Sequence, residues 1–305
     1  MAAAPPGCGA SGTLRPAMRR LQLVELHDTR WFPGVWRDLV TDFLAHYAAF
    51  FRPYSGVVDV LAEALERSGT TRMVDLGAGG GSTVLELKAP LDRALGRPVT
   101  VVLTDKYPNH GAFSGIVARH PTEVEAVAEP VDATVVPVEL VGFRTMFSSF
   151  HHFEPPVARA ILADAVRQGR GIGVFEYTER RLVRWLVPLI LIPALIWSLT
   201  PFIRPFAWRR LLWTYLLPVV PLVALWDGFV SVLRSYTPEE LTALVDSIED
   251  GGFRWQVGRV PSVWPCRVTY LVGTPQTADG RPDATPASAR QPGQSSSERT
   301  TEAPG

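Results

Sequence analysis

The sequence predicts an α/β fold in which a mostly parallel β-sheet carries helices on both faces. Residues 72–82 consist of a short apolar strand, a glycine-rich turn and the start of a helix, which together open a nucleotide-binding α/β unit. Strand and helix patterns then alternate as far as residue 177, as expected for parallel strands joined by crossover helices. The chain has 305 residues, enough for one domain of this kind with additional segments.

Two segments precede the glycine-rich turn. Residues 1–20 are rich in Ala, Pro and Gly and are predicted to be disordered. Residues 21–70 are predicted to form helices with an apolar, aromatic face. Four of their residues are expected either to cap the binding pocket or to serve ordinary helix packing: Trp31, Phe32, Trp36 and Arg37.

The glycine-rich turn is the predicted ligand site. Gly77, Gly79 and Gly81 allow a sharp turn and let a ligand lie against bare peptide. Amides at the N-terminus of the following helix then face polar or anionic ligand groups. A dinucleotide fingerprint has Gly or Ala at the sixth position from its first glycine. Counted from Gly77, that position is Ser82, so the fingerprint fails at its last residue.

The spacing is instead Asp-x-Gly-x-Gly-x-Gly, which begins at Asp75. It resembles the first motif of class I S-adenosylmethionine-dependent methyltransferases. The resemblance implies that Asp105, at the end of the second strand, binds the ribose hydroxyls of the cofactor S-adenosyl-L-methionine. It also implies that Asp132 and the neighbouring amide of Ala133 hold the adenine. A glycine turn beside ordinary strand-end aspartates is the alternative. The candidate cofactor-binding residues are Asp75, Gly77, Gly79, Gly81, Asp105, Asp132 and Ala133.

The remaining elements continue the alternation. Strands are predicted at 99–104, 123–129, 144–149 and 171–177, and helices at 109–120 and 154–169. A later helix is predicted to begin after Thr237, whose side chain caps it, with Pro238 in the first turn and Glu240 completing a capping box. This helix is expected to stop at Gly251 and Gly252.

Two strands, near 253–259 and 267–273, follow that helix. A final hairpin of this kind is what the resemblance implies, so the predicted fold is a seven-stranded, mostly parallel, Rossmann-like methyltransferase sheet. The methyltransferase domain is predicted to span residues 21–274. Residues 275–305 have almost no apolar residues and are predicted to be a disordered tail.

A hydrophobic insertion at residues 182–226 interrupts the sheet pattern. It has no acidic residue and holds five of the nine tryptophans, and a basic link joins its two apolar runs, 185–203 and 211–226. Trp and Arg at the ends of apolar helices suit a membrane interface. The second run covers only about 24 Å, short of a bilayer core of about 30 Å, and prolines interrupt both runs. An interfacial or shallowly inserted helical hairpin is therefore favoured, with a lid or oligomer contact and a two-span membrane anchor as the alternatives.

The place of the insertion indicates the kind of acceptor. It follows the fifth strand, beside the carboxyl edge of the sheet, where open α/β sheets bind ligands. An apolar wall there predicts a lipophilic small-molecule or lipid acceptor. The Asn/Asp-Pro-Pro-aromatic motif of enzymes that methylate DNA amines is missing, and the formal net charge is zero, so no nucleic-acid partner is expected.

The number and spacing of the cysteines indicate the cellular compartment and whether a metal site is expected. Cys8 and Cys266 are the two cysteines, so there is neither a disulfide framework nor a C-x-x-C pattern, and no metal is expected. The first twenty residues lack the apolar region of a secretory signal. We therefore expect a cytoplasmic protein that is peripheral to, or shallowly inserted in, the membrane.

His151 and His152 are the candidate catalytic residues. Methyl transfer mainly requires an aligned, desolvated nucleophile, and a histidine near neutral pKa can also remove the acceptor's proton. Many small-molecule methyltransferases resemble this chain in having a His-His pair at the end of the fourth strand. Strand alternation predicts that at most one of the two faces the cofactor. A helix-entry histidine that bonds the backbone without titrating is the alternative.

Two ion pairs are expected near this edge. Glu176, which ends the fifth strand with Tyr177, either lines the cleft or is paired with Arg180. Asp227 is expected to pair with Arg234 in a buried salt bridge that returns the insertion to the domain.

The predicted reaction is methyl transfer from S-adenosyl-L-methionine to an oxygen or carbon of a lipophilic small molecule or lipid. Two alternatives belong to other classes: a catalytically silent, membrane-associated binding or scaffold protein, and a nicotinamide-dependent oxidoreductase. The presence of Asp75, Asp105 and Asp132 together favours methyl transfer.

Overall fold

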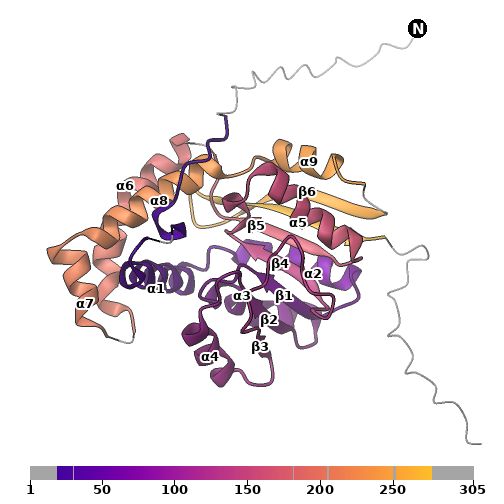
Figure 1. The fold of residues 1–305 in the computed structure, drawn as a ribbon, viewed down its shortest axis with the longest axis horizontal. Coiled ribbons are helices and arrows are strands. Elements are labelled where there is room, and N and C mark those ends of the chain that lie inside the picture. Colours follow the sequence, from indigo (N-terminus) through magenta and orange to yellow (C-terminus); the bar gives the residue numbers. More distant parts are fainter. Residues whose placement is uncertain (1–18, 30, 181, 205, 250–251, 277–305) are drawn as a thin grey trace, which may run out of the picture.

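A computed structural model describes residues 19–29, 31–180, 182–204, 206–249 and 252–276. The predicted disordered segments, 1–20 and 275–305, lie almost entirely outside these ranges. A seven-stranded sheet occupies the centre of the molecule, with the strand order β3-β2-β1-β4-β5-β7-β6 (Figure 1).

The strands are β1 (Arg72–Leu76), β2 (Thr100–Thr104), β3 (Val124–Ala126), β4 (Phe143–Phe147), β5 (Ile172–Glu176), β6 (Phe253–Pro261) and β7 (Arg267–Pro275). β1 to β5 pair in parallel, and β7 lies antiparallel between β5 and β6. The prediction of a seven-stranded, mostly parallel sheet with a final hairpin is confirmed. It is the sheet that the resemblance to class I methyltransferases implies.

The helices are α1 (Gly34–Phe51), α2 (Val58–Arg67), α3 (Ser82–Leu95), α4 (His110–Arg119), α5 (Pro155–Arg167), α6 (Leu182–Leu199), α7 (Trp208–Leu211), α8 (Val219–Arg234) and α9 (Pro238–Asp246). They cover both faces of the sheet because strand residues alternate. In β1, Met73 packs with α2, α3 and α4 on one face, whereas Val74 and Leu76 pack with α5 and α9 on the other.

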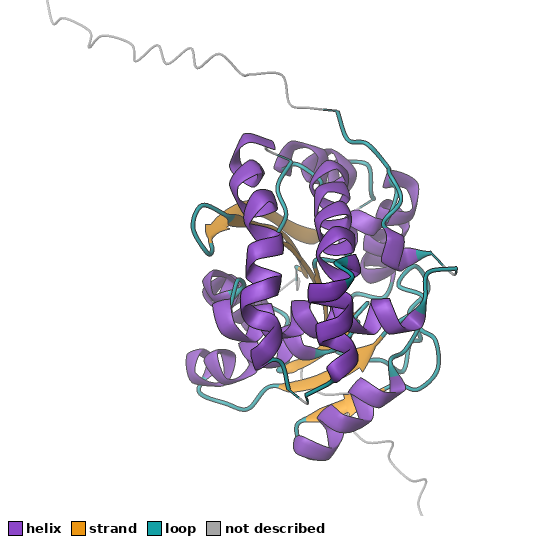
Figure 2. Ribbon diagram, turned by 90° about the vertical axis from the view of Figure 1, so that its left-hand side faces the viewer, coloured by secondary structure: helices purple, strands orange, loops and turns teal. Residues whose placement is uncertain are grey.

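The chain between β5 and α9 builds a separate apolar cluster with α1. Ile196 of α6 and Val220 and Val223 of α8 pack there against Leu39 and Phe43 of α1. These helices lie at one end of the molecule (Figure 1), and Figure 2, viewed from that end, shows them in front of the strands. The apolar face of α1 therefore packs on α6 and α8, whereas α2 packs on the sheet.

The second apolar helix is longer than its hydrophobic run. Residues 212–216 form a π-helical turn, and α8 then continues to Arg234, eight residues beyond the predicted end of the insertion at 226. Within the described part of the chain, no single helix is both long and apolar enough to cross a membrane. The pair Trp208–Leu216 and Val219–Arg234, bent by 72°, meets that test of length and composition together.

Other boundaries differ by a few residues. β3 is short because it pairs with β2 through only three residues. The predicted capping box is confirmed, since Thr237 Oγ1 accepts from the Glu240 amide and Glu240 Oε2 accepts from the Thr237 amide. α9 ends at Asp246, before the predicted glycines, because the Ser247 hydroxyl donates to the carbonyl of Leu244 and closes the last turn.

Candidate active site

The glycine-rich turn follows β1 at the carboxyl edge of the sheet. Its three glycines adopt positive φ angles of 70°, 56° and 73°, which other residues rarely adopt. A Cβ on Gly81 would lie 2.9 Å from the side-chain ends of Leu103 and Ile116, which would have to shift. A Cβ on Gly79 would meet nothing within 4 Å. The backbone therefore needs these glycines, and the turn presents bare peptide at Gly79.

Asp105 fixes the turn to β2. Its Oδ2 accepts a hydrogen bond of 2.8 Å from the Gly79 amide, and its Oδ1 accepts one of 2.8 Å from the Tyr107 amide. Each carboxylate oxygen can accept a further bond, so the group retains capacity for ribose hydroxyls. The Val131 amide donates to the Asp105 carbonyl at 2.9 Å, which places the Asp132 loop next to it. Binding of ribose by Asp105 stays a prediction.

Asp132 is held by three hydrogen bonds. Its Oδ1 accepts from the amide and hydroxyl of Thr134 at 2.9 and 2.7 Å, and its Oδ2 accepts from Lys106 Nζ at 2.9 Å. The hydrogen bonds of Thr134 and Lys106 lower the pKa of Asp132 to about 2. Ala133 beside it is buried. The role of Lys106 was not predicted, although it directly follows an aspartate of the motif.

Asp75 lies in β1 beneath the turn. The Thr145 hydroxyl donates to its Oδ1 at 2.8 Å, and the Thr104 hydroxyl donates to its carbonyl at 2.8 Å. Asp75 is 3% exposed, and this burial, together with the charge of Asp105, raises its pKa to about 7 despite the Thr145 hydrogen bond. Asp75 is thus placed to support the turn, and its direct contact with a cofactor stays a prediction.

Both candidate catalytic histidines lie beyond the fourth strand. β4 ends at Phe147, Ser148 takes a φ of 43°, and the histidines form the 3-10 turn Phe150–His152. The strand-alternation argument for His151 and His152 is therefore wrong, because neither belongs to a strand. Their ring centroids lie 4.3 Å apart.

His151 is buried between two carboxylates. Its Nδ1 lies 2.6 Å from Glu176 Oε2 and its Nε2 lies 3.5 Å from Glu25 Oε1. Burial disfavours the charged ring, but the charges and hydrogen bonds of Glu176 and Glu25 raise the pKa of His151 to about 10. An imidazolium held in this way keeps its proton at neutral pH, so His151 is poorly suited to act as a base.

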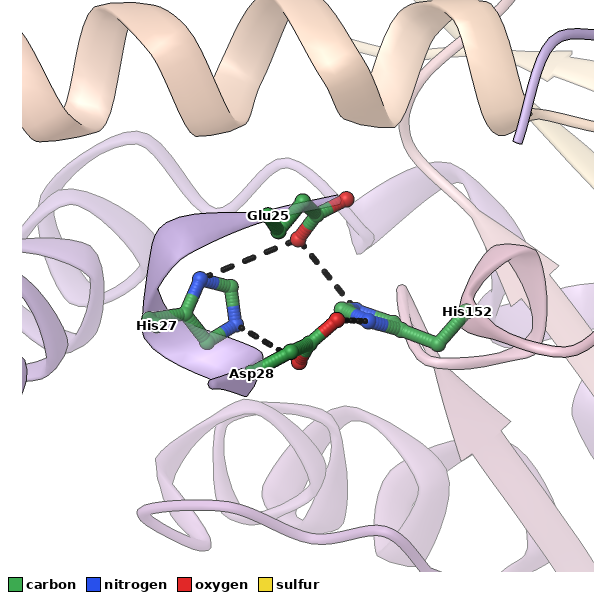
Figure 3. Close-up of side chains that lie close together, drawn as sticks. All are labelled: Glu25, His27, Asp28 and His152. Atoms are coloured by element: carbon green, nitrogen blue, oxygen red, sulfur yellow. Dashed lines mark hydrogen bonds and ion pairs between the residues drawn. The ribbon is translucent and has the colours of Figure 1, made fainter. Parts of the chain in front are cut away.

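His152 keeps more freedom. Its side chain is 22% exposed, its Nδ1 lies 2.8 Å from Asp28 Oδ2, and its Nε2 lies 3.7 Å from Glu25 Oε2 (Figure 3). A carboxylate on Nδ1 fixes the ring and its tautomer. Glu25 is buried, which would raise its pKa, but the hydrogen bond to His151 and the nearby imidazoles lower that pKa to about 2.

The expected ion pair between Asp227 and Arg234 is wrong. Arg234 Nη1 lies 3.2 Å from Asp28 and 3.4 Å from Glu25. Asp227 instead accepts from the Leu26 amide at 2.6 Å and lies 2.9 Å from His27 Nδ1. The N-terminal segment runs beside α8 and takes both partners, which nothing in the local sequence indicates.

Glu176 also has a partner other than the expected one. Its Oε1 accepts from the Phe150 amide at 2.8 Å and its Oε2 binds His151. Arg180 lies 2.6 Å from Glu240 of the capping box. Glu176 therefore positions the histidine turn and does not line the cleft as a free carboxylate.

Two tyrosines of the N-terminal region, Tyr47 in α1 and Tyr54 in the turn before α2, reach the same sheet edge. The hydroxyl of Tyr54 lies 2.5 Å from Ser148 Oγ, and that of Tyr47 lies 2.9 Å from the hydroxyl of Tyr177. Sequence reasoning assigned neither to the site, because both also fit the apolar spacing of a helix face. These contacts fix α1 and the start of α2 over the end of β4 and β5.

Of the four N-terminal residues predicted to cap the pocket or to serve ordinary packing, Phe32 and Trp36 pack against the insertion. Phe32 is buried in the cluster with α6 and α8, and the Trp36 ring lies 5.2 Å from Trp213. Arg37 donates to carbonyls of the preceding turn, and Trp31 is exposed. Ordinary packing is the reading that these contacts support.

No protein-family model matches the chain, and no curated protein matches it. Solved structures are similar to it in fold. An S-adenosylmethionine-dependent methyltransferase from Aquifex aeolicus is 16% identical, over 74% of this chain and 91% of that one, with a TM-score of 0.40. Magnesium protoporphyrin IX methyltransferase from Synechocystis PCC 6803, with bound S-adenosylhomocysteine, is 14% identical over 71% and 81%, with a TM-score of 0.38.

LepI in complex with S-adenosylmethionine is 17% identical over 67% of this chain, with a TM-score of 0.39. The chain spans 42% of LepI and 52% of the mitomycin 7-O-methyltransferase MmcR, which it also matches. At these identities the likeness concerns the fold alone, so the activity has to be argued from the residues of the site.

Proposed function

We propose that this chain transfers a methyl group from S-adenosyl-L-methionine to an oxygen or carbon of a lipophilic small molecule or lipid. The observation that carries the cofactor assignment is the bond between the Gly79 amide and Asp105. It sets a half-exposed carboxylate with spare acceptor capacity beside a turn of bare peptide. A cofactor with two ribose hydroxyls and a polar tail suits this pairing.

The chain's own residues would bind and orient the two reactants. Asp105 would hold the ribose and the Asp132 loop the adenine. S-adenosyl-L-methionine supplies the activated methyl group, so the protein mainly has to align the acceptor and exclude water. His152, fixed by Asp28 and partly exposed, is better placed than His151 to receive an acceptor proton.

The insertion supports a lipophilic acceptor. Among the insertion residues whose side chains the structure describes, the most exposed large apolar ones are Ile190, Phe202, Phe206, Trp208, Leu216 and Leu222. Large exposed apolar patches on a protein mark ligand, membrane or protein contacts. A groove of about 330 Å³ on α8 is lined by Leu222, Leu225, Trp226 and Phe229.

The insertion also lies next to the N-terminal segment that contacts His152. Trp226 Nε1 donates to the Val24 carbonyl at 3.1 Å, and the following residues of that segment contact His152. An acceptor held on α8 would therefore approach from this side. We propose that the same helices dock the protein on a membrane surface, as a peripheral or shallowly inserted element, with a lid or oligomer contact as the competing reading.

Calorimetric titration of the purified chain with S-adenosylhomocysteine and with NADH tests the cofactor. We expect saturable binding of S-adenosylhomocysteine at micromolar concentrations or below, corresponding to about 8 kcal/mol or more, and no binding of NADH. Binding of NADH alone would replace methyl transfer by nicotinamide-dependent oxidoreduction. Binding of neither would favour a silent scaffold protein.

A further inference from the structure

The geometry points to a divalent transition-metal site, of the kind that binds Zn²⁺, formed by Glu25, His27, Asp28 and His152. One ligand atom from each residue lies within 4.8 Å of the others. The site is separate from the glycine turn, but it shares His152 with the proposed methyl transfer. An ion on His152 Nε2 would occupy the nitrogen that would otherwise receive an acceptor proton. Its members come from the N-terminal segment and from the turn after β4, 124 residues further along the chain. That separation explains why sequence reasoning predicted no metal.

The four side chains form a ring. In Figure 3, Glu25 and Asp28 face the two imidazoles of His27 and His152 from opposite sides. Glu25 Oε2 lies 3.7 Å from His152 Nε2, and Asp28 Oδ1 lies 3.6 Å from His27 Nε2. These separations exceed a hydrogen bond. They approach the distance of about 3.4 Å between ligands of a tetrahedral ion whose bonds are about 2.0–2.2 Å long.

In each carboxylate, one oxygen contacts residues outside the ring and the other oxygen faces the ring. Glu25 Oε1 accepts from the Ser231 hydroxyl at 2.9 Å and lies 3.4 Å from Arg234. Asp28 Oδ2 likewise lies 3.2 Å from Arg234. Glu25 Oε2, in contrast, is buried and has no hydrogen-bond partner among the described residues. A buried carboxylate oxygen without a donor is costly, and an ion in the ring would satisfy it.

Both imidazoles are oriented by a carboxylate on the nitrogen that faces away from a ligand position. His27 Nδ1 lies 2.9 Å from Asp227 Oδ2, and His152 Nδ1 lies 2.8 Å from Asp28 Oδ2. Metal-binding histidines are commonly fixed in this way, because the second nitrogen donates to a carboxylate. Asp227 in turn is held by the amide of Leu26 at 2.6 Å.

The donor set selects the class of metal. Two imidazole nitrogens with two carboxylate oxygens suit Zn²⁺ and its first-row neighbours, whereas Mg²⁺ and Ca²⁺ prefer oxygen alone. A bound ion would join the segment before α1 to the turn that follows β4, on the side facing the insertion. Without an ion, Arg234 and the ring's own ion pairs would hold these residues, and the site would be a structural salt-bridge network.

Calorimetric titration of the metal-free, full-length chain with Zn²⁺, and absorption spectroscopy with Co²⁺, distinguish these readings. We expect one ion per chain with a Kd of about 10 μM or less, a visible Co²⁺ band, and no comparable binding of Mg²⁺. The substitution His27→Gln should weaken binding at least tenfold. His27 is a third exposed, so this change should leave the fold intact.

His120→Gln is the matched control, because His120 is exposed and lies 3.6 Å from a different carboxylate, Glu123. It should bind Zn²⁺ as the unchanged chain does. Equal weakening in both variants, or the absence of saturable Zn²⁺ binding, would overturn the proposal. If His27→Gln fails to fold, the melting temperature of the unchanged chain tests the metal site instead. It should rise with Zn²⁺ and not with Mg²⁺, and no rise would contradict the site. None of these measurements uses the cofactor, so they fail independently of the proposed function.

Discussion

At the residue scale, the most unusual group of the sheet edge is Asp75. Its pKa of about 7 exceeds the ordinary value of about 3.9 for an aspartate in an unfolded chain. Between these pH values the folded chain holds a proton that the unfolded chain has released. The contribution of Asp75 to the free energy of unfolding should therefore fall as pH rises from about 4 to about 7, and then level off.

The substitution Asp75→Asn removes this titration while keeping an acceptor for the Thr145 hydroxyl. Relative to the unchanged chain, the variant should gain about 2.5 kcal/mol of stability between pH 5 and pH 8, out of about 4 kcal/mol for the full shift. Urea unfolding at both pH values measures the gain. Asp59→Asn, at an exposed position of α2, is the control and should show no such gain. A parallel pH dependence in the unchanged chain and Asp75→Asn would contradict the buried, proton-holding Asp75.

Some residues of the site could be predicted from the sequence, and others could not. The glycines and Asp105 are constrained by local backbone geometry, so their spacing was informative. The partners of Asp227 and Arg234 could not be predicted, because the N-terminal segment that supplies them lies about 200 residues away in the sequence. Ion pairs between segments so distant leave no periodic pattern in the chain.

At the element scale, strands and helices were predictable where a pattern repeated. Alternating apolar residues in β1 and β2 and the capping signal at Thr237 gave the correct elements. The predicted end of β4 was wrong because the strand stops before Ser148, which takes a positive φ. A serine in the sequence does not indicate that conformation. The burial of Arg144 inside β4 was equally invisible, since its partner Asp164 lies in α5.

That pair allows a test of how α5 is joined to the sheet. Arg144 Nη1 lies 2.7 Å from Asp164 Oδ2 and both side chains are fully buried. Asp164→Ala would leave a buried, unpaired guanidinium and should lower the free energy of unfolding by about 3–5 kcal/mol. Adding Arg144→Met should recover much of that loss. Denaturant unfolding of the single and double variants measures both steps.

The exposed pair of Arg72 and Glu125, 2.7 Å apart, is the control for that experiment. Glu125→Ala should cost under about 1 kcal/mol, because water screens an exposed ion pair. If Asp164→Ala costs no more than this, then the buried pair does not hold α5 on the sheet.

At the scale of the whole molecule, the apolar helices α6 to α8 are the proposed surface for membrane docking. We predict that the chain floats with anionic phosphatidylglycerol vesicles. The apolar term is about 25 cal/mol per Å² of buried surface, with about 1 kcal/mol for each arginine near anionic lipid. High salt should weaken binding only in part, because salt screens the arginines and not the apolar contact.

A triple substitution of exposed residues tests this surface: Trp208→Ser, Leu216→Ser and Leu222→Ser. It should lower vesicle binding at least tenfold. Val135→Ser with Val138→Ser, also exposed but between β3 and β4, should leave it unchanged. An unchanged chain that stays with the soluble fraction would exclude membrane docking and leave a lid or an oligomer contact for α6 to α8.

The central claim is that the carboxyl edge of the sheet binds S-adenosyl-L-methionine through Asp105. Titration of S-adenosylhomocysteine into the unchanged chain and into Asp105→Ala tests it most directly. Charge-assisted bonds to two ribose hydroxyls are worth about 1.5–3 kcal/mol each, so the variant should bind at least about tenfold more weakly. Equal affinity in the two proteins, or no binding to the unchanged chain, would contradict the account.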